Sequence, residues 1–221
     1  MKRPGLFITL EGIDGTGKST QYRLLVNYLQ KLGHSVCATR EPGGTPVGEA
    51  IRGIFLKSSN TELTALTELL LVTAARVQHI LEVIIPALAG GTIVLCDRFY
   101  DATAVYQGYA GGASLELIGS SHHLFCGGLM PDLTLLLDCS HELGIARSRA
   151  RNRQAGLELS EGRFEDKDMA FHGRVRQGYL ACVDREPDRF IIINAGESIE
   201  AMHEKIVHSV TAKLREKGYA V

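Results

Sequence analysis

The segment with the most definite chemistry is a glycine-rich run near the N-terminus. Residues 12–19 read Gly-Ile-Asp-Gly-Thr-Gly-Lys-Ser and fit the pattern G-x-x-x-x-G-K-[ST] at every position. Glycines allow the backbone to curl until successive N–H groups point at phosphate oxygens, and the helix expected after them adds its positive end. Lys18 can bring a positive charge to the β- and γ-phosphates, and the Ser19 hydroxyl can ligate Mg²⁺. The run predicts a site for a nucleoside triphosphate with magnesium.

Charged residues after two other apolar runs indicate where a second substrate binds. Asp97 and Arg98 follow the apolar run Thr92–Cys96. A carboxylate at Asp97 is placed to hold the hydration shell of Mg²⁺, and Arg98 can neutralise a second phosphate group. Residues 40–45, Arg-Glu-Pro-Gly-Gly-Thr, follow another such run, Ser35–Thr39. Together these residues predict an acceptor site beside the glycine-rich loop.

Two arginines on predicted helices extend this group. Arg52 follows residues 40–45, and Arg76 lies within Thr-Ala-Ala-Arg-Val-Gln, on a helix expected to begin near Glu62. An arginine in such apolar surroundings is costly unless it has a partner. Taken singly, each arginine is also compatible with a surface salt bridge. Because these residues are all expected at the same edge of one sheet, together they indicate a binding site.

The spacing of apolar residues predicts the elements that position these side chains. Short β-rich apolar runs alternate with longer segments whose apolar residues recur at helical spacing. This alternation is typical of an α/β fold in which a parallel sheet is covered on both faces. Ligands of such sheets bind at the carboxyl ends of the strands. The five predicted strands are Leu6–Glu11, Ser35–Thr39, Thr92–Cys96, Leu133–Asp138 and Phe190–Asn194.

The composition excludes several classes of protein. Of the 221 residues, 45% are hydrophobic and 22% charged, and the formal net charge is −1. These values are typical of a globular domain, not of a protein coated in positive charge for nucleic acid or anionic membrane. The sequence shows neither a signal peptide nor an apolar run of membrane-spanning length. The five cysteines are widely spaced without a C-x-x-C, which predicts free thiols and a cytoplasmic protein.

An arginine-rich segment stands out between residues 147 and 165. It surrounds a Gly- and polar-rich stretch, residues 152–162, and reads as a helix end that runs into a mobile surface segment. A solvated basic helix face or a small nucleic-acid patch is the alternative, but Phe164 alone offers a ring for base stacking. The arginines are Arg147, Arg149, Arg151, Arg153 and Arg163.

Several motifs together resemble the thymidylate kinase family of P-loop nucleoside monophosphate kinases, which phosphorylate dTMP. The resemblance runs from about residue 6 to 216, in the family's order, and implies one kinase domain over residues 1–221. It also implies a lid over about 147–165, ATP as phosphoryl donor, Mg²⁺ as cofactor and a homodimer. The motifs are Glu11–Thr20, Arg40–Thr45, Ala74–Arg76, Asp97–Arg98, Tyr106–Gly108 and Pro131–Leu133.

The resemblance implies roles at both substrates. Asp14 would orient the dTMP phosphate and its metal shell, and Arg98 would bind that phosphate, with Arg52 as a weaker match. Serine and carboxylate ligands for the metal would be Ser19 and Asp97. The implied ATP-binding residues are Gly12, Ile13, Asp14, Gly15, Thr16, Gly17, Lys18, Ser19 and Thr20.

For the nucleoside, Arg76 would donate to the thymine carbonyl and Thr103 would face thymine N3. Tyr106 would lie against the deoxyribose, where a ribose 2′-hydroxyl would clash, and Gln107 would lie at the rim of the base pocket. The chain departs from the family at two positions: Ala102 replaces a frequent Ser, and Val72 replaces the Phe that stacks on thymine. Phe55 and Phe99 are candidate replacements for that ring. The implied dTMP-binding residues are Asp14, Arg52, Val72, Arg76, Arg98, Thr103, Tyr106 and Gln107.

The arginines of the lid indicate which subtype of the family the chain resembles. Some family members carry a catalytic arginine inside the phosphate loop, but Gly15 and Thr16 occupy the corresponding positions. The charge that stabilises a phosphoryl transition state must then come from elsewhere. Arg151, Arg153 and Arg163 are the available donors, and Arg163 is the first choice. The predicted catalytic residues are Lys18, Arg98, Arg153, Arg163 and Asp14.

Two other functions remain open at this point. The nearest is a kinase for another small acceptor, such as a different nucleoside monophosphate or a nucleoside. The more remote is a nucleotide-dependent switch protein, although the chain lacks the N/T-K-x-D tetrad that guanine-reading switches carry; Asp166-Lys167-Asp168 does not have its spacing. No H-E-x-x-H or G-x-S-x-G pattern points to a metalloprotease or a serine hydrolase.

Overall fold

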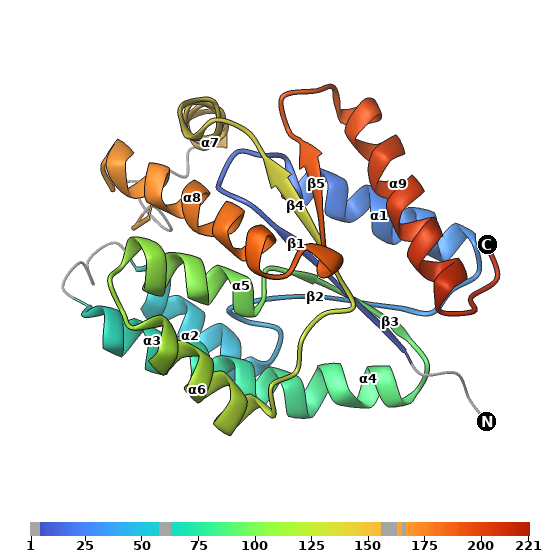
Figure 1. Cartoon of the computed structure of the whole chain (residues 1–221), viewed down its shortest axis with the longest axis horizontal. Helices are drawn as coiled ribbons and strands as arrows, with labels where there is room; N and C mark the ends of the chain where they lie inside the picture. Colours follow the sequence, from blue (N-terminus) through green and yellow to red (C-terminus); the bar gives the residue numbers. More distant parts are fainter. Residues whose placement is uncertain (1–4, 58–62, 156–162, 165–166) are drawn as a thin grey trace.

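A five-stranded parallel sheet forms the centre of the computed structural model, which describes residues 5–57, 63–155, 163–164 and 167–221 (Figure 1). The strand order is β2-β3-β1-β4-β5, and every pair is parallel. The predicted α/β fold is confirmed, although the second and third strands begin and end one residue later than predicted. The strands are β1 (Leu6–Glu11), β2 (Val36–Arg40), β3 (Ile93–Asp97), β4 (Leu133–Asp138) and β5 (Phe190–Asn194).

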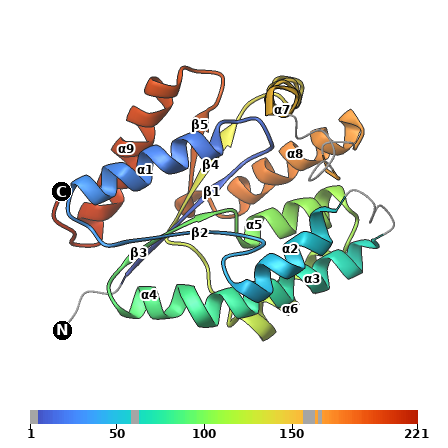
Figure 2. The ribbon, with the colours of Figure 1, turned by 180° about the vertical axis from the view of Figure 1, so that it is seen from behind.

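Helices cover both faces of the sheet (Figures 1 and 2). Helices α1 (Lys18–Lys31) and α9 (Ile199–Glu216) pack together on one face. The remaining elements lie mainly over the other face and beyond the carboxyl edge. They are α2 (Pro46–Leu56), α3 (Ala65–His79), η1 (Ile80–Ile84), α4 (Ile85–Ala89), α5 (Tyr100–Thr103), η2 (Ala104–Ala110), α6 (Leu115–Cys126), α7 (His141–Ala155), α8 (Met169–Arg185) and η3 (Pro187–Arg189).

Alternate residues of the central strands feed two separate hydrophobic cores. On β1, Ile8 joins a cluster that includes residues of α1 and α9, whereas Phe7 joins a cluster with Leu69 of α3 and Ile118 of α6. Both side chains are at most 1% exposed. This two-sided burial explains why the strand reads as a continuous apolar run and not as an alternating one.

The register brings the charged strand ends to one edge. In the ladder, Asp97 at the end of β3 lies opposite Leu10 of β1 on one side and opposite Arg40 of β2 on the other. Strand β1 is the point where the chain order reverses, since β3 lies on one side of it and β4 on the other. Ligands of open α/β sheets bind in the crevice at such a point.

The helices near this edge begin at residues that cap them. The Thr45 side chain accepts a hydrogen bond from the Gly48 amide, with Pro46 as the first residue of α2, and Thr64 accepts from the Thr67 amide at the start of α3. The described helix with Arg76 therefore begins at Ala65; Glu62, where the sequence predicted its start, lies outside the described residues.

One helical stretch of the described chain, Ala65–Ala89, is long and apolar enough to cross a membrane by length and composition. The expectation from the sequence that no apolar run of membrane-spanning length is present is therefore wrong by length and composition. Of its most apolar window, 44% is buried inside the protein. The stretch also carries the polar side chains of Glu68, Arg76 and His79, all of which are buried and hydrogen-bonded. These contacts are those of a core helix.

Candidate active site

The glycine-rich run folds as a loop between β1 and α1, the context that its sequence requires. Gly12 and Gly15 have φ angles of 136° and 77°, in the region that side chains disfavour. A Cβ atom at Gly15 would stand 1.9 Å from the carbonyl oxygen of Gly144 on α7, and one at Gly12 would stand 2.3 Å from that of Leu137. Only glycine fits these two positions, because the loop lies against the backbone of neighbouring elements.

Lys18, the first residue of α1, lies across this loop. Its ammonium group donates hydrogen bonds to the carbonyl oxygens of Gly12 and Ile13, at 2.9 and 2.7 Å. The side chain is 8% exposed, and burial, together with the nearby Arg98, lowers the pKa of Lys18 to about 8. The lysine thus brings to the loop a charge that is poorly hydrated.

Arg98 lies beside the loop and contacts residues of three elements. Its Nη2 donates to Asp14 Oδ1 at 2.7 Å, its Nη1 donates to the Tyr179 hydroxyl at 3.0 Å, and its guanidinium carbon lies 4.9 Å from the centre of the Tyr106 ring. Burial opposes the charge of Arg98, but the neighbouring Tyr106, Tyr179 and Asp14 raise its pKa well above the usual value. Although burial also opposes the carboxylate of Asp14, Arg98 and Lys18 hold the pKa of Asp14 below its usual value.

The predicted metal ligands suit Mg²⁺. Asp97 Oδ1 is buried and has no hydrogen-bond partner among the described residues, and Ser19 lines the same cavity. Hard oxygen donors are the ligands that Mg²⁺ prefers, and the ion is commonly held by one or two protein groups together with substrate phosphates. In keeping with this, the described residues contain no group of three or more His, Cys, Asp or Glu that could hold a metal.

A cavity of about 800 Å³ connects the loop with the acceptor side. It brings together most of the residues that the sequence predicted for both substrates. Gly12, Ile13 and Thr16 do not line it: Ile13 and Thr16 are buried at 2% and 1% exposure, and Gly12 lies against Leu137. The predicted residues that line the cavity are Asp14, Gly15, Gly17, Lys18, Ser19, Thr20, Arg52, Val72, Arg76, Asp97, Arg98, Thr103, Tyr106 and Gln107.

Arg76 has the partner that its apolar sequence context requires. Its Nε donates to Glu41 Oε2 at 2.7 Å, and its Nη2 donates to Thr103 Oγ1 at 2.6 Å. The second oxygen of Glu41 is 3.0 Å from His79 Nδ1. Burial opposes the charge of Arg76, but Glu41 raises its pKa above the usual value. The sequence analysis placed Glu41 in a motif but did not assign it this role.

At the far end of the cavity, Glu68 joins a pocket residue to the arginine-rich segment. Its Oε2 accepts from Gln107 Nε2 at 2.8 Å, and its Oε1 accepts from Arg163 Nη2. Arg163 also donates to the Phe55 carbonyl oxygen at 2.9 Å and is 4% exposed. The structure therefore places Arg163 at the acceptor end and does not bring it together with the phosphate loop.

The other arginines of residues 147–165 are placed differently. Arg147 and Arg151, both on α7, line the cavity near the loop, and Arg147 Nη1 donates to the Ala195 carbonyl oxygen at 2.6 Å. Arg153 is exposed on the same helix and is not among the lining residues. The segment 156–162 lies outside the described residues. The assignment of Arg153 and Arg163 as catalytic residues stays a prediction.

Aromatic side chains line the same cavity as Val72. Phe55 and Phe164 both line the cavity, with ring centres 5.4 Å apart, and belong to the same hydrophobic cluster as Val72. The sequence analysis named Phe55 and Phe99 as possible rings at the base pocket, and both line the cavity. It missed Phe164 at this place because the residue was considered only as a stacking group for nucleic acid.

A single cavity with a phosphate loop at one end and buried arginines at the other can hold a phosphoryl donor and an acceptor side by side. A switch protein needs only the first of these. Fold and cavity together thus define this chain as a kinase of the P-loop class. The particular family within that class follows from comparison with known proteins.

The thymidylate kinase family model matches residues 10–206. Thymidylate kinase of Syntrophotalea carbinolica is 48% identical over 200 residues, which cover 90% of this chain and 92% of that protein. The enzyme of Desulfovibrio desulfuricans is 46% identical over 96% of this chain and 98% of its own length. A crystal structure of thymidylate kinase from Ehrlichia chaffeensis superposes with a TM-score of 0.75 at 34% identity, covering 94% of this chain and 99% of that one. This chain belongs to the thymidylate kinase family.

Proposed function

We propose that this chain transfers the γ-phosphoryl group of ATP to dTMP, giving ADP and dTDP. The observation that carries the proposal is the shared cavity, in which Lys18 of the phosphate loop and Arg98 of the acceptor side both lower the pKa of Asp14. Two cations near one carboxylate suit two phosphate groups that must approach each other. The acceptor is a phosphate oxygen that is already ionised, so the reaction requires no strong general base.

Catalysis then rests on alignment and on neutralisation of charge. Lys18 binds the β- and γ-phosphates, and Arg98 orients the acceptor phosphate for in-line attack. Ser19 and the Asp97 carboxylate would hold Mg²⁺, which would supply positive charge to neutralise the phosphate groups. The side chains of Lys18 and Arg98 are both largely shielded from solvent. This shielding strengthens their interaction with the charge that develops in the transition state.

The nucleoside end of the cavity reads the base and the sugar. Arg76 already donates to Thr103, so both lie where the edge of a thymine ring can be reached. Gln107 is held by Glu68 at the rim, and Tyr106 lies between Arg98 and the Phe164 ring. In this arrangement Tyr106 lies against the deoxyribose and excludes a 2′-hydroxyl.

Residues 147–165 act as the lid that covers ATP within a single domain, residues 1–221. Arg147 and Arg151 on α7 already face the cavity, and a closed lid excludes water and so suppresses ATP hydrolysis. Arg163 can contribute charge to the γ-phosphate only if it leaves Glu68. The lid therefore moves between a position with the Glu68 ion pair and one without it.

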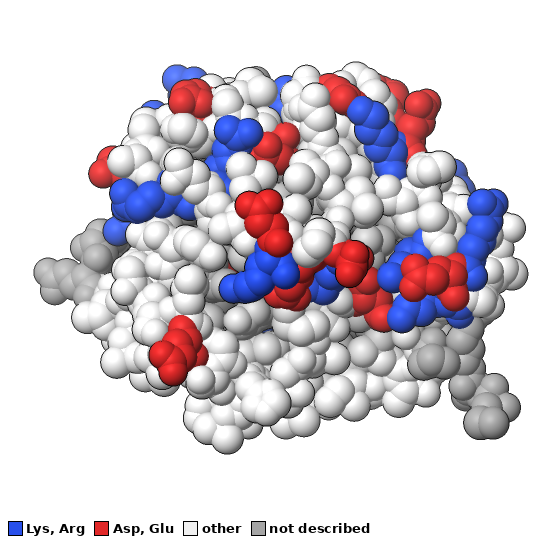
Figure 3. Space-filling model, viewed as in Figure 1, with Lys and Arg blue, Asp and Glu red and all other residues white. Residues whose placement is uncertain are grey.

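The enzyme is a cytoplasmic homodimer that binds neither nucleic acid nor membrane. Leu66 and Leu70 on α3 are 53% and 59% exposed, and Leu124 and Phe125 on α6 are 74% and 56% exposed. These two helices pack against each other, and the lower face in Figure 3 is largely uncharged. An apolar face of this kind suits a second copy of the chain.

A coupled assay of ADP release across a panel of nucleoside monophosphates tests the activity. We expect dTMP to give the highest kcat/KM and the ribonucleotide analogue to be a poor substrate. Preference for another monophosphate would overturn dTMP as the substrate while leaving the kinase mechanism standing. GTP or ATP turnover without any dependence on an acceptor would overturn both.

A further inference from the structure

The backbone of Arg98 has a conformation that requires support. Its φ angle is 68°, and no other described residue except glycine has a positive φ. Such a conformation is strained for a residue with a side chain and persists where the surroundings enforce it. Two hydrogen bonds from the end of β1 do so: the Arg98 amide donates to the Leu10 carbonyl oxygen at 3.0 Å, and the Phe99 amide donates to Glu11 Oε1 at 2.8 Å.

The same glutamate also reaches the Arg98 side chain, through Tyr179. The Tyr179 hydroxyl donates to Glu11 Oε2 at 2.8 Å and accepts from Arg98 Nη1 at 3.0 Å. With Glu11 ionised, the direction of both bonds follows, because a guanidinium only donates and a carboxylate only accepts. Glu11 is 0% exposed and Tyr179 is 2% exposed. One carboxylate therefore holds both the turn that carries Arg98 and, through a hydroxyl, its guanidinium.

The electrostatics argue against a purely structural role for this carboxylate. Burial, followed by the neighbouring Asp101, raises the pKa of Glu11 to about 7, whereas Arg98, Tyr179 and the Phe99 amide lower it. A buried carboxylate is an expensive way to stabilise a core. Its cost is understandable if it fixes a cation whose position matters for the reaction.

We propose that Glu11 and Tyr179 are positioning residues that fix the Arg98 guanidinium for the acceptor phosphate. The proposal rests on the proposed function, in which Arg98 binds the phosphate of dTMP. Asp14 and the face of Tyr106 restrain the guanidinium on its other sides. Neither Glu11 nor Tyr179 lines the cavity, so both act through Arg98 and not on the substrate.

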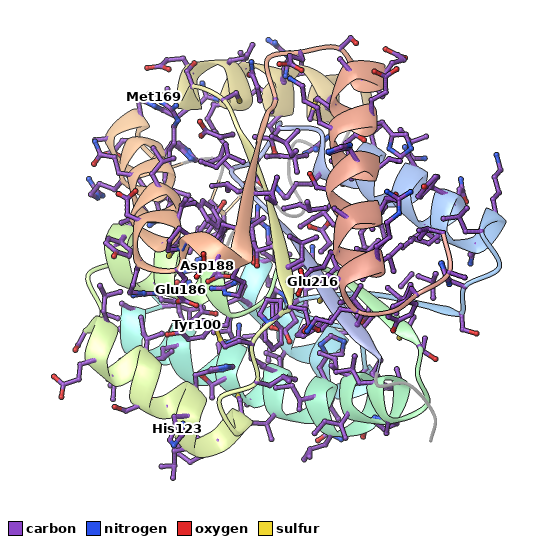
Figure 4. The ribbon with its side chains drawn as sticks, turned by 45° about the vertical axis from the view of Figure 1, so that its right-hand side comes forward. Tyr100, His123, Met169, Glu186, Asp188 and Glu216 are labelled. Atoms are coloured by element: carbon purple, nitrogen blue, oxygen red, sulfur yellow. The ribbon has the colours of Figure 1, made fainter. Side chains whose placement is uncertain are left out.

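Tyr179 also connects this contact to the lid. It belongs to α8, which follows residues 147–165 in the chain and runs from Met169 towards Glu186, near Tyr100 of α5 (Figure 4). The hydroxyl that holds Arg98 is therefore carried by the helix to which the lid is attached.

A double-mutant cycle tests the proposal. Tyr179→Phe removes only the hydroxyl, and Arg98→Met removes the guanidinium but keeps a linear side chain. The dissociation constant of dTMP is measured by NMR titration, which reads weak binding, in the wild type, both single variants and the double variant. Tyr28→Phe is the matched control, because its hydroxyl bonds Thr211 between α1 and α9, on the opposite face of the sheet.

We expect Tyr179→Phe to weaken dTMP about tenfold, or about 1.4 kcal/mol, because the charged guanidinium loses one of the hydrogen bonds that hold it. The KM for ATP should not change, and the same substitution should change dTMP affinity less than twofold when Arg98 is already Met. Glu11→Gln, which keeps the shape but loses one acceptor, should also weaken dTMP, whereas Tyr28→Phe should not.

The positioning role would be overturned if Tyr179→Phe changed the dissociation constant of dTMP by the same factor in the wild type and in Arg98→Met. It would also be overturned if the Tyr179→Phe protein bound dTMP like the wild type. Neither result would affect the proposed function, which the wild-type assay tests by itself. If that assay selects another monophosphate, the cycle is run with that molecule and is decided by the same criterion. If Tyr179→Phe does not fold, the cycle with Glu11→Gln decides.

Discussion

The donor end and the acceptor end of the cavity are built in different ways. The donor end is one continuous segment, residues 12–19, and its glycines and lysine are all close together in the sequence. The acceptor end is assembled from α2, α3, β3 and η2, and its cations are held by carboxylates distant in the chain. Glu41 is 35 residues from Arg76, and Glu68 is 95 residues from Arg163.

This difference has a physical origin. A loop that binds phosphate through backbone N–H groups needs mainly conformational freedom, which glycine provides locally. A site that reads a base needs buried cations, and each must have a partner that the fold brings to it. Substitution of Lys18 at the donor end should therefore change catalysis with little effect on folding, whereas loss of a partner at the acceptor end should lower both activity and stability.

The largest effect is expected from removing a partner at the acceptor end. Glu41→Ala leaves Arg76 buried without its carboxylate and should lower the free energy of unfolding by about 3–5 kcal/mol. Urea denaturation measures this change. Glu216→Ala is the control: the Glu216 side chain is 60% exposed beside Lys213 at the end of α9, and its loss should cost about 1 kcal/mol or less (Figure 4). Equal losses in the two variants would contradict the comparison.

At the donor end, Lys18→Ala should leave the unfolding transition nearly unchanged and reduce kcat about 100- to 1000-fold. The expected loss corresponds to about 2.7–4 kcal/mol for one preorganised electrostatic contact in a transition state. Steady-state assays with saturating ATP and dTMP, together with thermal denaturation, measure both quantities. More than about a tenth of the wild-type kcat in the variant would refute the role of this lysine.

The two arginines predicted in the lid can be ranked by the same assay. Arg163→Ala should lower kcat more than it weakens dTMP binding, if the residue leaves Glu68 to meet developing charge. If Arg153→Ala lowers kcat strongly and Arg163→Ala does not, the lid mechanism stands and Arg153 is the catalytic arginine. If kcat is unchanged in both variants, the lid only excludes water, and the positive charge in the transition state comes from residues such as Arg147.

The pH dependence of ATP capture should reveal Lys18. Below pH 8 its ammonium group is protonated in the free enzyme, and above that pH it loses its charge. The kcat/KM for ATP, which reports ionisations of the free enzyme, should fall about tenfold per pH unit above about 8. In Lys18→Arg the charge persists, so the residual kcat/KM should stay level over the same range. If the kcat/KM of the wild type for ATP does not fall above pH 8, the lowered pKa of Lys18 is contradicted.

The smallest effect concerns the base pocket. Val72 is 5% exposed in a cluster that already contains the rings of Phe55 and Phe164. Val72→Phe should therefore overpack this region, weaken dTMP several-fold and cost about 1–3 kcal/mol of stability. Titration of dTMP into both proteins measures the change in affinity. Tighter binding would mean instead that the pocket has an empty place for a ring.

The same contrast explains how much could be predicted from the sequence. The strands were predicted to within one residue because their buried faces make them continuous apolar runs, and the glycine-rich loop was predicted because its chemistry is contiguous. The sequence also predicted Arg76 as a site residue that needs a partner; the structure shows that it lines the cavity and has one. The sequence could not identify Glu41 as that partner, because the pairing depends on how the segment after β2 meets α3.

Glu11, Tyr179 and Glu68 show the limit most clearly. Glu11 directly precedes the loop, but nothing local indicates that its carboxylate bonds to a tyrosine 168 residues away. Tyr179 and Glu68 read as ordinary residues of amphipathic helices. The role of Arg163 at the donor stays a prediction from its charge, and its ion pair with Glu68 could not be predicted from the sequence. A buried acidic residue on an apolar helix face is the signal that could have identified Glu68.

The contact between Gly15 and Gly144 limits how this enzyme can evolve. Because any side chain at position 15 would collide with the backbone of α7, and a Cβ atom at Gly144 would stand 2.7 Å from the Asp14 carbonyl oxygen, the two positions constrain each other. An arginine at position 15 of the loop would therefore require α7 to withdraw as well. No single substitution at either position achieves this, so a loop with an arginine at position 15 can arise only through coordinated change.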